Sequence, residues 1–209
     1  MTRIDHLVVR AETLAEGVDF VEAALGVKMA GGGEHKGYGT HNRLMGLGSE
    51  MYLEVIAPNP DEPLPGNARM FDMDRFSGPP SLSAWVLSAN SVSKAMALSP
   101  QGMGELLALS RGDFHWLFSF PPEGRLPFGG AFPALIEWQS PHPAPLLPES
   151  GCRFTGLEIG HPEADELARS LAPLLQEPRV RLTQAEAFFM RAQIHTPAGP
   201  RILAAVVST

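Results

Sequence analysis

Apolar and polar residues alternate in short runs along much of the chain, a pattern that indicates β-strands. The clearest case is THNRLMGLGSEMYLEVIA, where residues 41–47 and 51–57 are predicted to be two strands joined by a turn at 48–50. Side chains of a strand point alternately to its two faces, so Glu54 should share a face with Tyr52. A buried carboxylate is costly unless it is paired or bound to a metal, so Glu54 is expected to have a partner.

This hairpin completes a unit of five elements. A strand at 4–11 is followed by a helix, with Thr13 as its N-cap, Glu16 at capping-box spacing and Gly26 at its end. A further strand is predicted at 27–30, where three glycines then interrupt it. The order is therefore one strand, one helix and three strands.

The same order recurs twice further along the chain, and a repeat of this length is itself a fold-level signal. The second copy is predicted to have strands at 82–89, 103–111, 114–120 and 133–139 and a helix at 91–98. The third, which is less clear, is predicted to have strands at 153–160, 180–183, 188–195 and 201–207 and a helix from Pro162 to about 175. We therefore divide the chain into a first unit (1–58), a proline-rich linker (59–81), a second unit (82–148) and a third unit (149–209).

Composition and charge are those of an acidic globular protein. The 209 residues allow one large domain or two small ones, and 44% of them are apolar. The formal net charge is −7 and no basic cluster is present, so nucleic acid is not expected as a partner. The lone Cys152 cannot form an internal disulfide, which favours a reducing compartment. Without a signal peptide or an apolar run of the roughly 20 residues that a membrane helix needs, a cytoplasmic protein without a membrane partner is expected.

The three βαβββ units, together with the phrases IDHLVV, LGV, GTHNRLMGLG and YLEVIA, resemble the vicinal oxygen chelate superfamily and its glyoxalase-like branch. The resemblance covers the first two units well and the third weakly. It implies an α+β fold in which the first two units pair edge to edge and their curled mixed sheet encloses one pocket. The third βαβββ unit would then close an edge or bury the other sheet.

The resemblance also implies a set of metal ligands. Metal-dependent members bind Zn, Ni, Mn or Fe through the first and last strands of each unit, and the metal polarises substrate oxygens. Carried over to this chain, the ligands are His6 and Glu54 in the first unit and Glu137 in the second, with ALIEW laid on YLEVI. Ala84 stands where a fourth ligand is expected, which leaves metal binding open. Glu54 and Glu137 near one histidine could equally perform general acid–base catalysis.

Four further residues are candidates for substrate contacts. Arg111 ends a strand before a turn and is well placed to hold a carboxylate by a bidentate contact. Asn42 belongs to the phrase GTHN and lies with His41 at the entrance to the first hairpin, while Trp138 follows Glu137. These positions predict a substrate-binding role.

The same residues also have purely structural interpretations. His6 could be a satisfied histidine of the core, and Glu54 could pair with an arginine. Glu137 could face water at a sheet edge. The aromatic face of residues 114–120 is more typical of core than of a ligand-binding wall.

Together these features predict a glyoxalase-like enzyme that acts on a small, oxygen-rich metabolite between the first two units. The reaction could be that of an isomerase, a lyase or a ring-opening dioxygenase, with a divalent metal (Zn, Mn, Fe or Ni) as the only cofactor implied. The alternative, favoured by Ala84 and the aromatic face, is a metal-free protein of the same fold that sequesters a small molecule. A scaffold protein without a working pocket is a third option. Edge strands of such sheets can pair between chains, so a monomer or a homodimer is expected.

Overall fold

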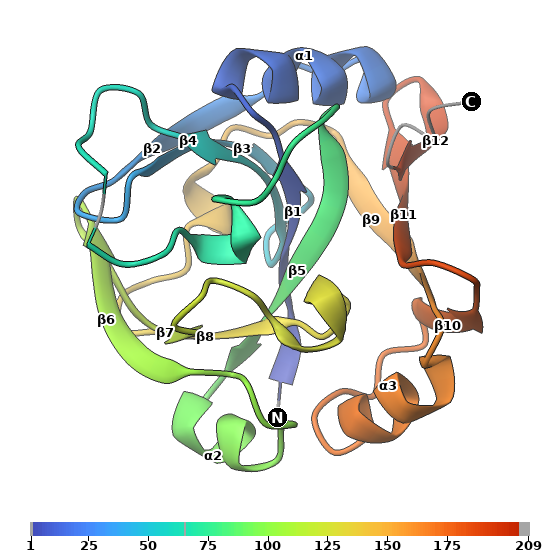
Figure 1. The fold of residues 1–209 in the computed structure, drawn as a ribbon. Helices are drawn as coiled ribbons and strands as arrows, with labels where there is room; N and C mark the ends of the chain where they lie inside the picture. Colours follow the sequence, from blue (N-terminus) through green and yellow to red (C-terminus); the bar gives the residue numbers. More distant parts are fainter. Residues whose placement is uncertain (1, 65, 205–209) are drawn as a thin grey trace.

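The computed structural model describes residues 2–64 and 66–204, and these form two β-sheets and a small number of helices (Figure 1). The elements in chain order are β1 (Thr2–Arg10), α1 (Leu14–Leu25), β2 (Ala30–His35), β3 (Thr40–Gly46), β4 (Tyr52–Pro58), η1 (Met70–Asp72), β5 (Ser81–Ala89), α2 (Val92–Ala97), β6 (Glu105–Arg111), β7 (Phe114–Phe120), η2 (Pro127–Gly130), β8 (Ala134–Trp138), η3 (Ala144–Leu146), β9 (Arg153–His161), α3 (Ala164–Leu171), β10 (Val180–Gln184), β11 (Phe189–Thr196) and β12 (Gly199–Ala204). The α+β class predicted from the sequence is confirmed.

The large sheet has eight strands in the order β2-β3-β4-β1-β5-β8-β7-β6. From the centre outward, the first half has the order β1-β4-β3-β2 and the second half the equivalent order β5-β8-β7-β6. The two halves meet where β1 pairs with β5 in antiparallel fashion. The sheet is mixed, because β1 pairs with β4, and β5 with β8, in parallel. It curls so that β2 and β6, its two ends, approach each other (Figure 1). The predicted curled mixed sheet is confirmed.

Local sequence explains the first helix. The Thr13 hydroxyl accepts a hydrogen bond from the backbone N–H of Glu16, as expected of the N-cap residue. The Glu16 carboxylate accepts from the Thr13 hydroxyl rather than from the Thr13 backbone N–H, so the second bond of the expected capping box is replaced. At the other end Gly26 takes the left-handed conformation, with φ of 70°, that ends a helix at little steric cost.

The glycine run lies inside β2 rather than at its end, so the prediction of a strand at 27–30 was displaced. A register shift separates Ala30 from Gly33 where β2 pairs with β3. Gly32 has φ of 111°, and a Cβ there would lie 2.2 Å from the backbone oxygen of Asn42. The glycines thus allow a bulged strand to pass close to its neighbour.

The proline-rich segment between the first two units is packed against the large sheet. Met70 and Phe71 of η1 are buried, and Arg10 of β1 donates a hydrogen bond to the backbone oxygen of Phe71 at 2.8 Å. Arg69 donates to the backbone oxygen of Gly39 at 2.9 Å. The segment is therefore an integral part of the core and not a loose connection.

The last part of the chain forms a second sheet of four strands, in the order β10-β9-β11-β12. Its elements follow the predicted order, but β10 pairs with β9, whereas in the large sheet the corresponding strands β2 and β6 pair with β3 and β7. Helix α3 is shorter than predicted, since it begins after Pro162 and ends before Pro173. Residues 205–207 of the predicted last strand lie outside the described residues.

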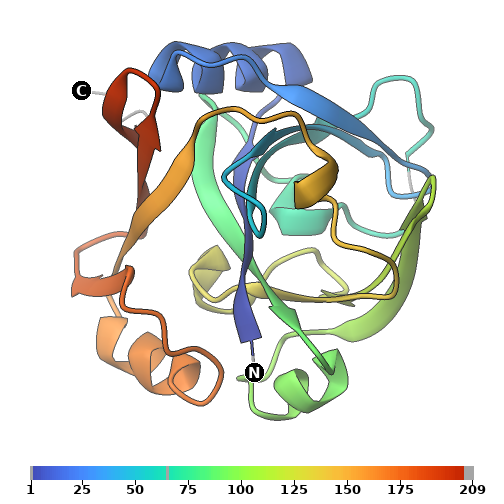
Figure 2. The ribbon, with the colours of Figure 1, turned by 180° about the vertical axis from the view of Figure 1, so that it is seen from behind.

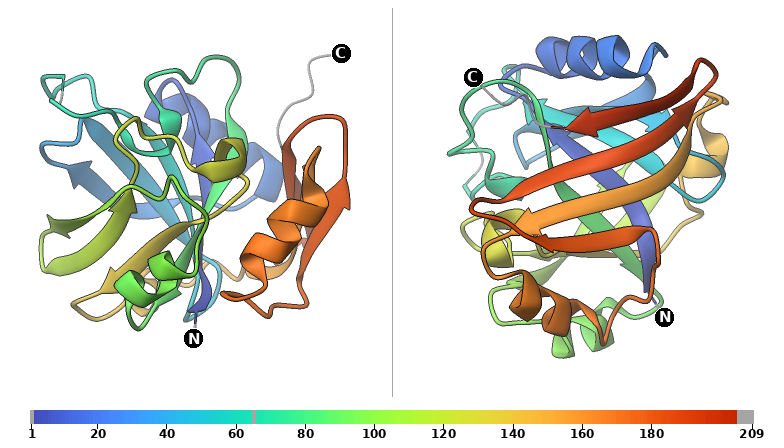
Figure 3. Two further views of the ribbon diagram at one scale, coloured as in Figure 1. Left: turned by 60° about the horizontal axis from the view of Figure 1, so that its bottom comes forward. Right: turned by 90° about the vertical axis from the view of Figure 1, so that its right-hand side faces the viewer.

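The small sheet lies against the back of the large one, as the right-hand view of Figure 3 shows with β11 and β12 in front of β1 and β5. Helix α1 also packs on this side, between β4 and β12. Strand β5 is consequently buried from Leu82 to Ala89, along almost its entire length. A strand with both faces covered is expected to be apolar throughout, and β5 largely is. Among the described residues, no helix is both long and apolar enough to cross a membrane.

Candidate functional site

A pocket lies on the concave side of the large sheet and contains about 410 Å³ of empty space, part of it open to solvent. Its polar wall comes from the first unit and consists of His6, His35, Asn42, Tyr52 and Glu54. Its apolar wall comes from the second unit and from the packed linker and consists of Trp116, Phe118, Ile136, Trp138, Met70 and Phe71. The lining is completed by Leu44 of β3 and by Arg111, which is the last residue of β6.

The polar wall is organised around His6, which lies between two buried carboxylates. Its Nδ1 is 2.7 Å from Asp5 Oδ1, and its Nε2 is 3.4 Å from Glu54 Oε2. The ring of Tyr52 stacks on the imidazole, with ring centroids 4.4 Å apart. The partner that the sequence required for Glu54 is therefore this histidine, together with an asparagine described below.

A β-bulge brings Asp5 and His6 together. The pairing of β1 with β5 shifts by one residue between Ile4 and His6, so that Asp5 is the extra residue. In a regular strand these neighbours would face opposite sides, and the bulge re-aims one of them. The result is a histidine that lines the pocket and a carboxylate partner that is buried next to it.

Two more side chains fix Asp5 in place. Trp138 donates its indole N–H to Asp5 Oδ2 at 2.8 Å, and His142 Nε2 lies 3.0 Å from the same oxygen. His142 Nδ1 accepts a hydrogen bond from the backbone N–H of Ala144, so the proton of a neutral His142 lies on Nε2 and is donated to Asp5. The carboxylate of Asp5 is fully buried and satisfied on both oxygens.

These contacts set the charges of the cluster. Burial alone would lower the pKa of His6, but the hydrogen bonds and negative charges of Asp5 and Glu54 outweigh burial and raise the pKa to about 9. Burial would raise the pKa of Glu54, but the hydrogen bond and charge of His6 and the amide of Asn42 lower it to about 2. The pKa of Asp5 is held well below its usual range against burial, by His142 and His6. At neutral pH the cluster is an imidazolium between two carboxylates.

Asn42 connects this cluster to Arg111. Its amide nitrogen donates to Glu54 Oε1 at 2.6 Å and lies 3.3 Å from His35 Nε2. Its carbonyl oxygen accepts from the Arg111 guanidinium at 2.8 Å and from the backbone N–H of Gly33 at 2.9 Å. All four hydrogen-bonding positions of the Asn42 amide are thus occupied, which fixes its orientation.

His35 is the neutral member of the site. Its Nδ1 lies 2.9 Å from the hydroxyl of Thr40, and its Nε2 is the acceptor available to Asn42. Burial is the main cause that lowers its pKa to about 4, with the positive charges of Arg111 and His6 acting in the same direction. His35 is not among the site residues predicted from the sequence.

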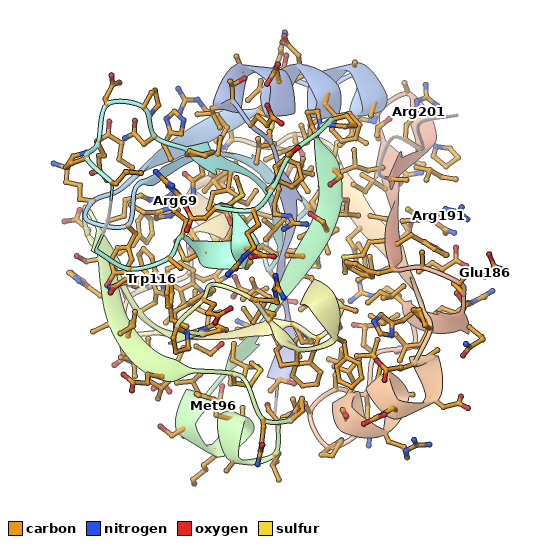
Figure 4. All side chains as sticks on the ribbon, in the orientation of Figure 1. Arg69, Met96, Trp116, Glu186, Arg191 and Arg201 are labelled. Atoms are coloured by element: carbon orange, nitrogen blue, oxygen red, sulfur yellow. The ribbon has the colours of Figure 1, made fainter. Side chains whose placement is uncertain are left out.

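The second unit supplies an aromatic wall. Trp116 and Trp138 have ring centroids 5.3 Å apart, and Phe71 from the linker meets Phe118 edge to face at 6.0 Å. Figure 4 shows Trp116 within the curl of the large sheet, whereas Arg191 and Arg201 point outward from the small sheet. The aromatic face of β7, expected to be plain core, therefore belongs in part to the pocket.

Not all predicted site residues reach this pocket. Glu137 lies between Ile136 and Trp138 in β8, which both face the pocket, so its own side chain faces the other way. Its carboxylate accepts hydrogen bonds from the backbone N–H of Val92, at the start of α2, and from the Gln139 side chain, each at 2.8 Å. The structure does not bring Glu137 to His6 and Glu54.

Two other predicted positions also lie outside the pocket. His41 precedes Asn42 on β3 and does not line the pocket, and burial is the main cause that lowers its pKa. Ala84 is buried opposite Val8, where β5 pairs with β1. By contrast Asn42, Arg111 and Trp138 do line it, as predicted residues of a substrate site would.

The donor set does not fit a resident metal ion. His6 Nε2 and Glu54 Oε2 are the two atoms of suitable kind that converge, and the groups around them are an amide, a guanidinium and aromatic rings. Catalytic zinc sites have three protein ligands. Within residues 2–64 and 66–204, no group of three His, Cys, Asp or Glu side chains could hold a metal ion. The chemistry that these residues can perform is proton transfer and charge recognition.

Residues 4–175 match the family model described as "Glyoxalase-like domain", so the chain belongs to this family of the vicinal oxygen chelate superfamily. The predicted family is thereby confirmed. A hypothetical protein from Staphylococcus aureus has a similar structure, with a TM-score of 0.65 and 13% identity over 90% of this chain and 88% of that one.

A single-residue variant of methylmalonyl-CoA epimerase from Streptomyces coelicolor, in complex with 2-nitronate-propionyl-CoA, is also similar, with a TM-score of 0.44 and 17% identity over 66% of this chain and 98% of that one. The sequence has no match among curated proteins.

Proposed function

We propose that the protein is an enzyme that moves a proton on a small, oxygen-bearing metabolite without a metal, with Glu54 as the base and His6 as the hydrogen-bond donor. The observation that carries this proposal is the position of His6 between Asp5 and Glu54 at the wall of a pocket. An imidazolium whose Nδ1 is held by a carboxylate has its Nε2–H available to stabilise negative charge on a bound oxygen.

The contact between His6 and Glu54 is suited to being broken by a ligand. At 3.4 Å it is longer than an ordinary N–H···O hydrogen bond, so a substrate carbonyl oxygen can take over the Nε2–H. Glu54 then loses the partner that keeps its pKa low, and its pKa rises toward the range in which a carboxylate is an effective base. Binding thereby generates the base that the reaction needs.

The proposed step removes a proton from the carbon next to the substrate carbonyl. The carbon–hydrogen bond breaks, the proton moves to a Glu54 oxygen, and the electron pair forms an enolate whose oxygen accepts the hydrogen bond from His6. Return of the proton to the same face of the same carbon restores the substrate and gives only exchange, whereas its delivery to a neighbouring atom gives an isomerisation. The surrounding apolar side chains strengthen the charge–charge interactions within the pocket.

Solvent-deuterium exchange tests this step directly. A panel of small ketones, aldehydes and 2-oxo acids would be incubated with the protein in D2O, and exchange next to the carbonyl would be followed by NMR. We expect the wild type to accelerate exchange for at least one compound that binds, and Glu54→Gln to be slower by about 100-fold or more. Prior dialysis against EDTA should leave the exchange rate unchanged. No exchange with any compound that binds would overturn the proposal.

A metal-free binding protein is the second candidate. It is favoured by the mutual pairing of Asn42, His35 and Glu54, which are satisfied before any ligand arrives, and by the aromatic wall of Trp116 and Trp138. Such a protein would be stabilised by a ligand in thermal unfolding but would not catalyse exchange. In that case Glu54→Gln would change the ligand affinity and the ligand-induced rise in unfolding temperature to a similar extent. Neither the wild type nor the variant would accelerate exchange.

A further inference from the structure

We propose that the pocket selects a monocarboxylate that carries a planar apolar group, with Arg111 as the residue that binds the carboxylate. This inference rests on the proposed function, since it names the substrate class of the same pocket. It is argued from the unused donors of Arg111, from the saturation of the other polar groups and from the aromatic wall.

Arg111 carries a positive charge that is not neutralised within the described residues, where it forms no ion pair. Its guanidinium donates one hydrogen bond to the neutral amide of Asn42 and lies 5.9 Å from the ring centroid of Phe114. A guanidinium has five N–H donors in a planar fork. The remaining donors, at the lining of the pocket, match the two oxygens of a carboxylate.

A glycine on the neighbouring strand leaves space for the Arg111 side chain. Arg111 ends β6 in the second unit, yet its side chain crosses to β2 of the first unit, where a Cβ on Gly33 would lie 2.9 Å from its Cδ. The absence of a side chain at Gly33 makes room for the arginine stem. Gly33 also donates its backbone N–H to Asn42 Oδ1, the same oxygen that accepts from Arg111. Both hydrogen bonds therefore meet at one atom.

The other polar groups of the pocket have little capacity to bind an anion. Asn42 uses all of its hydrogen-bonding positions, and both nitrogens of His35 are engaged. The His6 imidazolium is flanked by two carboxylates. A carboxylate that enters the pocket therefore meets Arg111 as its charged partner.

The charges also limit the ligand to a single negative charge. Asp5, His6 and Glu54 together carry one net negative charge, and Arg111 contacts the neutral amide of Asn42 rather than either carboxylate. A phosphate or a dicarboxylate would bring its second charge close to Glu54, where the apolar surroundings make repulsion costly. The pocket accordingly favours a monoanion.

The remaining surface of the pocket selects an apolar ring. Trp116, Phe118, Trp138 and Phe71 face the polar wall, and aromatic rings pack favourably on one another in offset or edge-to-face arrangements. A ligand with its carboxylate on Arg111 would rest its ring on this wall. The carbon atoms between ring and carboxylate would then lie on the side of Glu54.

Titration calorimetry with three probes on the full chain tests the proposal. Phenylacetate carries both recognised groups, 2-phenylacetamide has the ring without the charge, and acetate has the charge without the ring. We expect 2-phenylacetamide and acetate each to bind at least about tenfold more weakly than phenylacetate. Phenyl phosphate should bind more weakly than phenylacetate. Equal affinity for phenylacetate and 2-phenylacetamide would overturn the assignment.

Variants of Arg111 separate recognition of charge from damage to the pocket. Arg111→Leu should lower the affinity for phenylacetate by about tenfold or more and change the affinity for 2-phenylacetamide by less than about threefold. Arg201→Gln, which removes an exposed arginine of the small sheet, serves as the matched control and should bind like the wild type. An equal loss for both probes would show that Arg111 only maintains the pocket and would contradict the proposal.

These outcomes are independent of the proposed reaction. The probes need only bind, so preferential binding of phenylacetate, together with no exchange on any carbonyl compound that binds, would support the ligand class while overturning the proton-transfer function. Conversely, exchange on uncharged ketones with no preference for carboxylates would support the reaction and overturn the role given to Arg111.

Discussion

Asp5 Oδ1 lies 2.7 Å from His6 Nδ1, although the two residues are neighbours on a strand. The contact occurs at the bulge in β1, where Asp5 is the extra residue. A carboxylate behind a histidine fixes the orientation of the ring and favours its charged form.

Asp5→Asn should lower the pKa of His6 and destabilise the fold. An asparagine has one carbonyl oxygen for the three donors that now meet Asp5, those of His6, Trp138 and His142. At least one buried donor would lose its acceptor, which costs about 1–3 kcal/mol of unfolding free energy. NMR titration of the His6 ring and urea unfolding would measure the two effects. The control is Asp113→Asn, in an exposed turn, and an unchanged His6 pKa in Asp5→Asn would contradict the role of Asp5.

Stability should be greatest near pH 6.5, because two buried histidines shift in opposite directions. The pKa of His6 is raised from 6.5 to about 9, so its contribution is complete below 6.5 and is lost as pH rises through 9. The pKa of His35 is lowered from 6.5 to about 4, so its contribution is complete above 6.5 and is lost as pH falls through 4. The His6 shift corresponds to a loss on the order of 3 kcal/mol on the alkaline side.

Urea unfolding at intervals between pH 4 and 9.5 would measure this profile. His35→Gln should flatten the acid side and leave the alkaline decline in place. A free energy of unfolding that stays constant between pH 6.5 and 9 would rule out the charged state assigned to His6.

Gly33→Ala should weaken carboxylate binding with little effect on the fold. The new Cβ would press on the Arg111 side chain, which is flexible, and the backbone of Gly33 is not in the left-handed region. We expect the affinity for phenylacetate to fall several-fold, while the free energy of unfolding changes by less than about 1 kcal/mol. Gly66→Ala is the matched control, since a Cβ there has no neighbour within 4 Å. Equal affinities of the two variants would argue against the placement of Arg111.

Glu137→Gln should leave the pocket intact and loosen helix α2. Glu137 accepts the backbone N–H of Val92, so its charge stabilises the start of a short helix. A neutral side chain should lower the free energy of unfolding by up to about 1 kcal/mol. Phenylacetate binding, measured by calorimetry, should not change. A loss of binding comparable to that of Glu54→Gln would instead return Glu137 to the site.

Much of the framework follows from the sequence. Alternation correctly put Glu54 on the same face as Tyr52, and both residues line the pocket. The N-cap at Thr13 and the helix end at Gly26 were visible because they depend on neighbouring residues alone. Strands and helices governed by local pattern were therefore found close to their true limits.

The site was less accessible because its geometry depends on distant partners. The role of Asp5 depends on a bulge that is defined only by pairing with β5, and His142 reaches Asp5 from a loop 137 residues away in sequence. Figure 2 shows that loop, which includes η3, passing in front of β3 and β4 in this view, and Ala144 in it packs against Tyr52. No periodic pattern marks such a contact.

The placement of Glu137 shows how sensitive a strand is to alignment. When ALIEW was laid on YLEVI, the two glutamates were matched by a shift of one residue. A shift of one residue exchanges the two faces of a strand, so the match carried Glu137 to the wrong side of the sheet. The pocket-facing neighbours Ile136 and Trp138 are apolar, which explains why the second unit contributes a wall and not metal ligands.

The burial of β5 on both faces ties the two sheets into one folding unit. The strand has the pocket layer on one side and β11 and β12 on the other, so neither layer has a complete core without it. A chain that ended at residue 148 would uncover the back of this strand and expose a large apolar surface to water. Because both sheets pack on β5, they are expected to unfold together. A substitution that destabilises the small sheet would therefore also lower the fraction of molecules with an intact pocket, without any direct contact with His6.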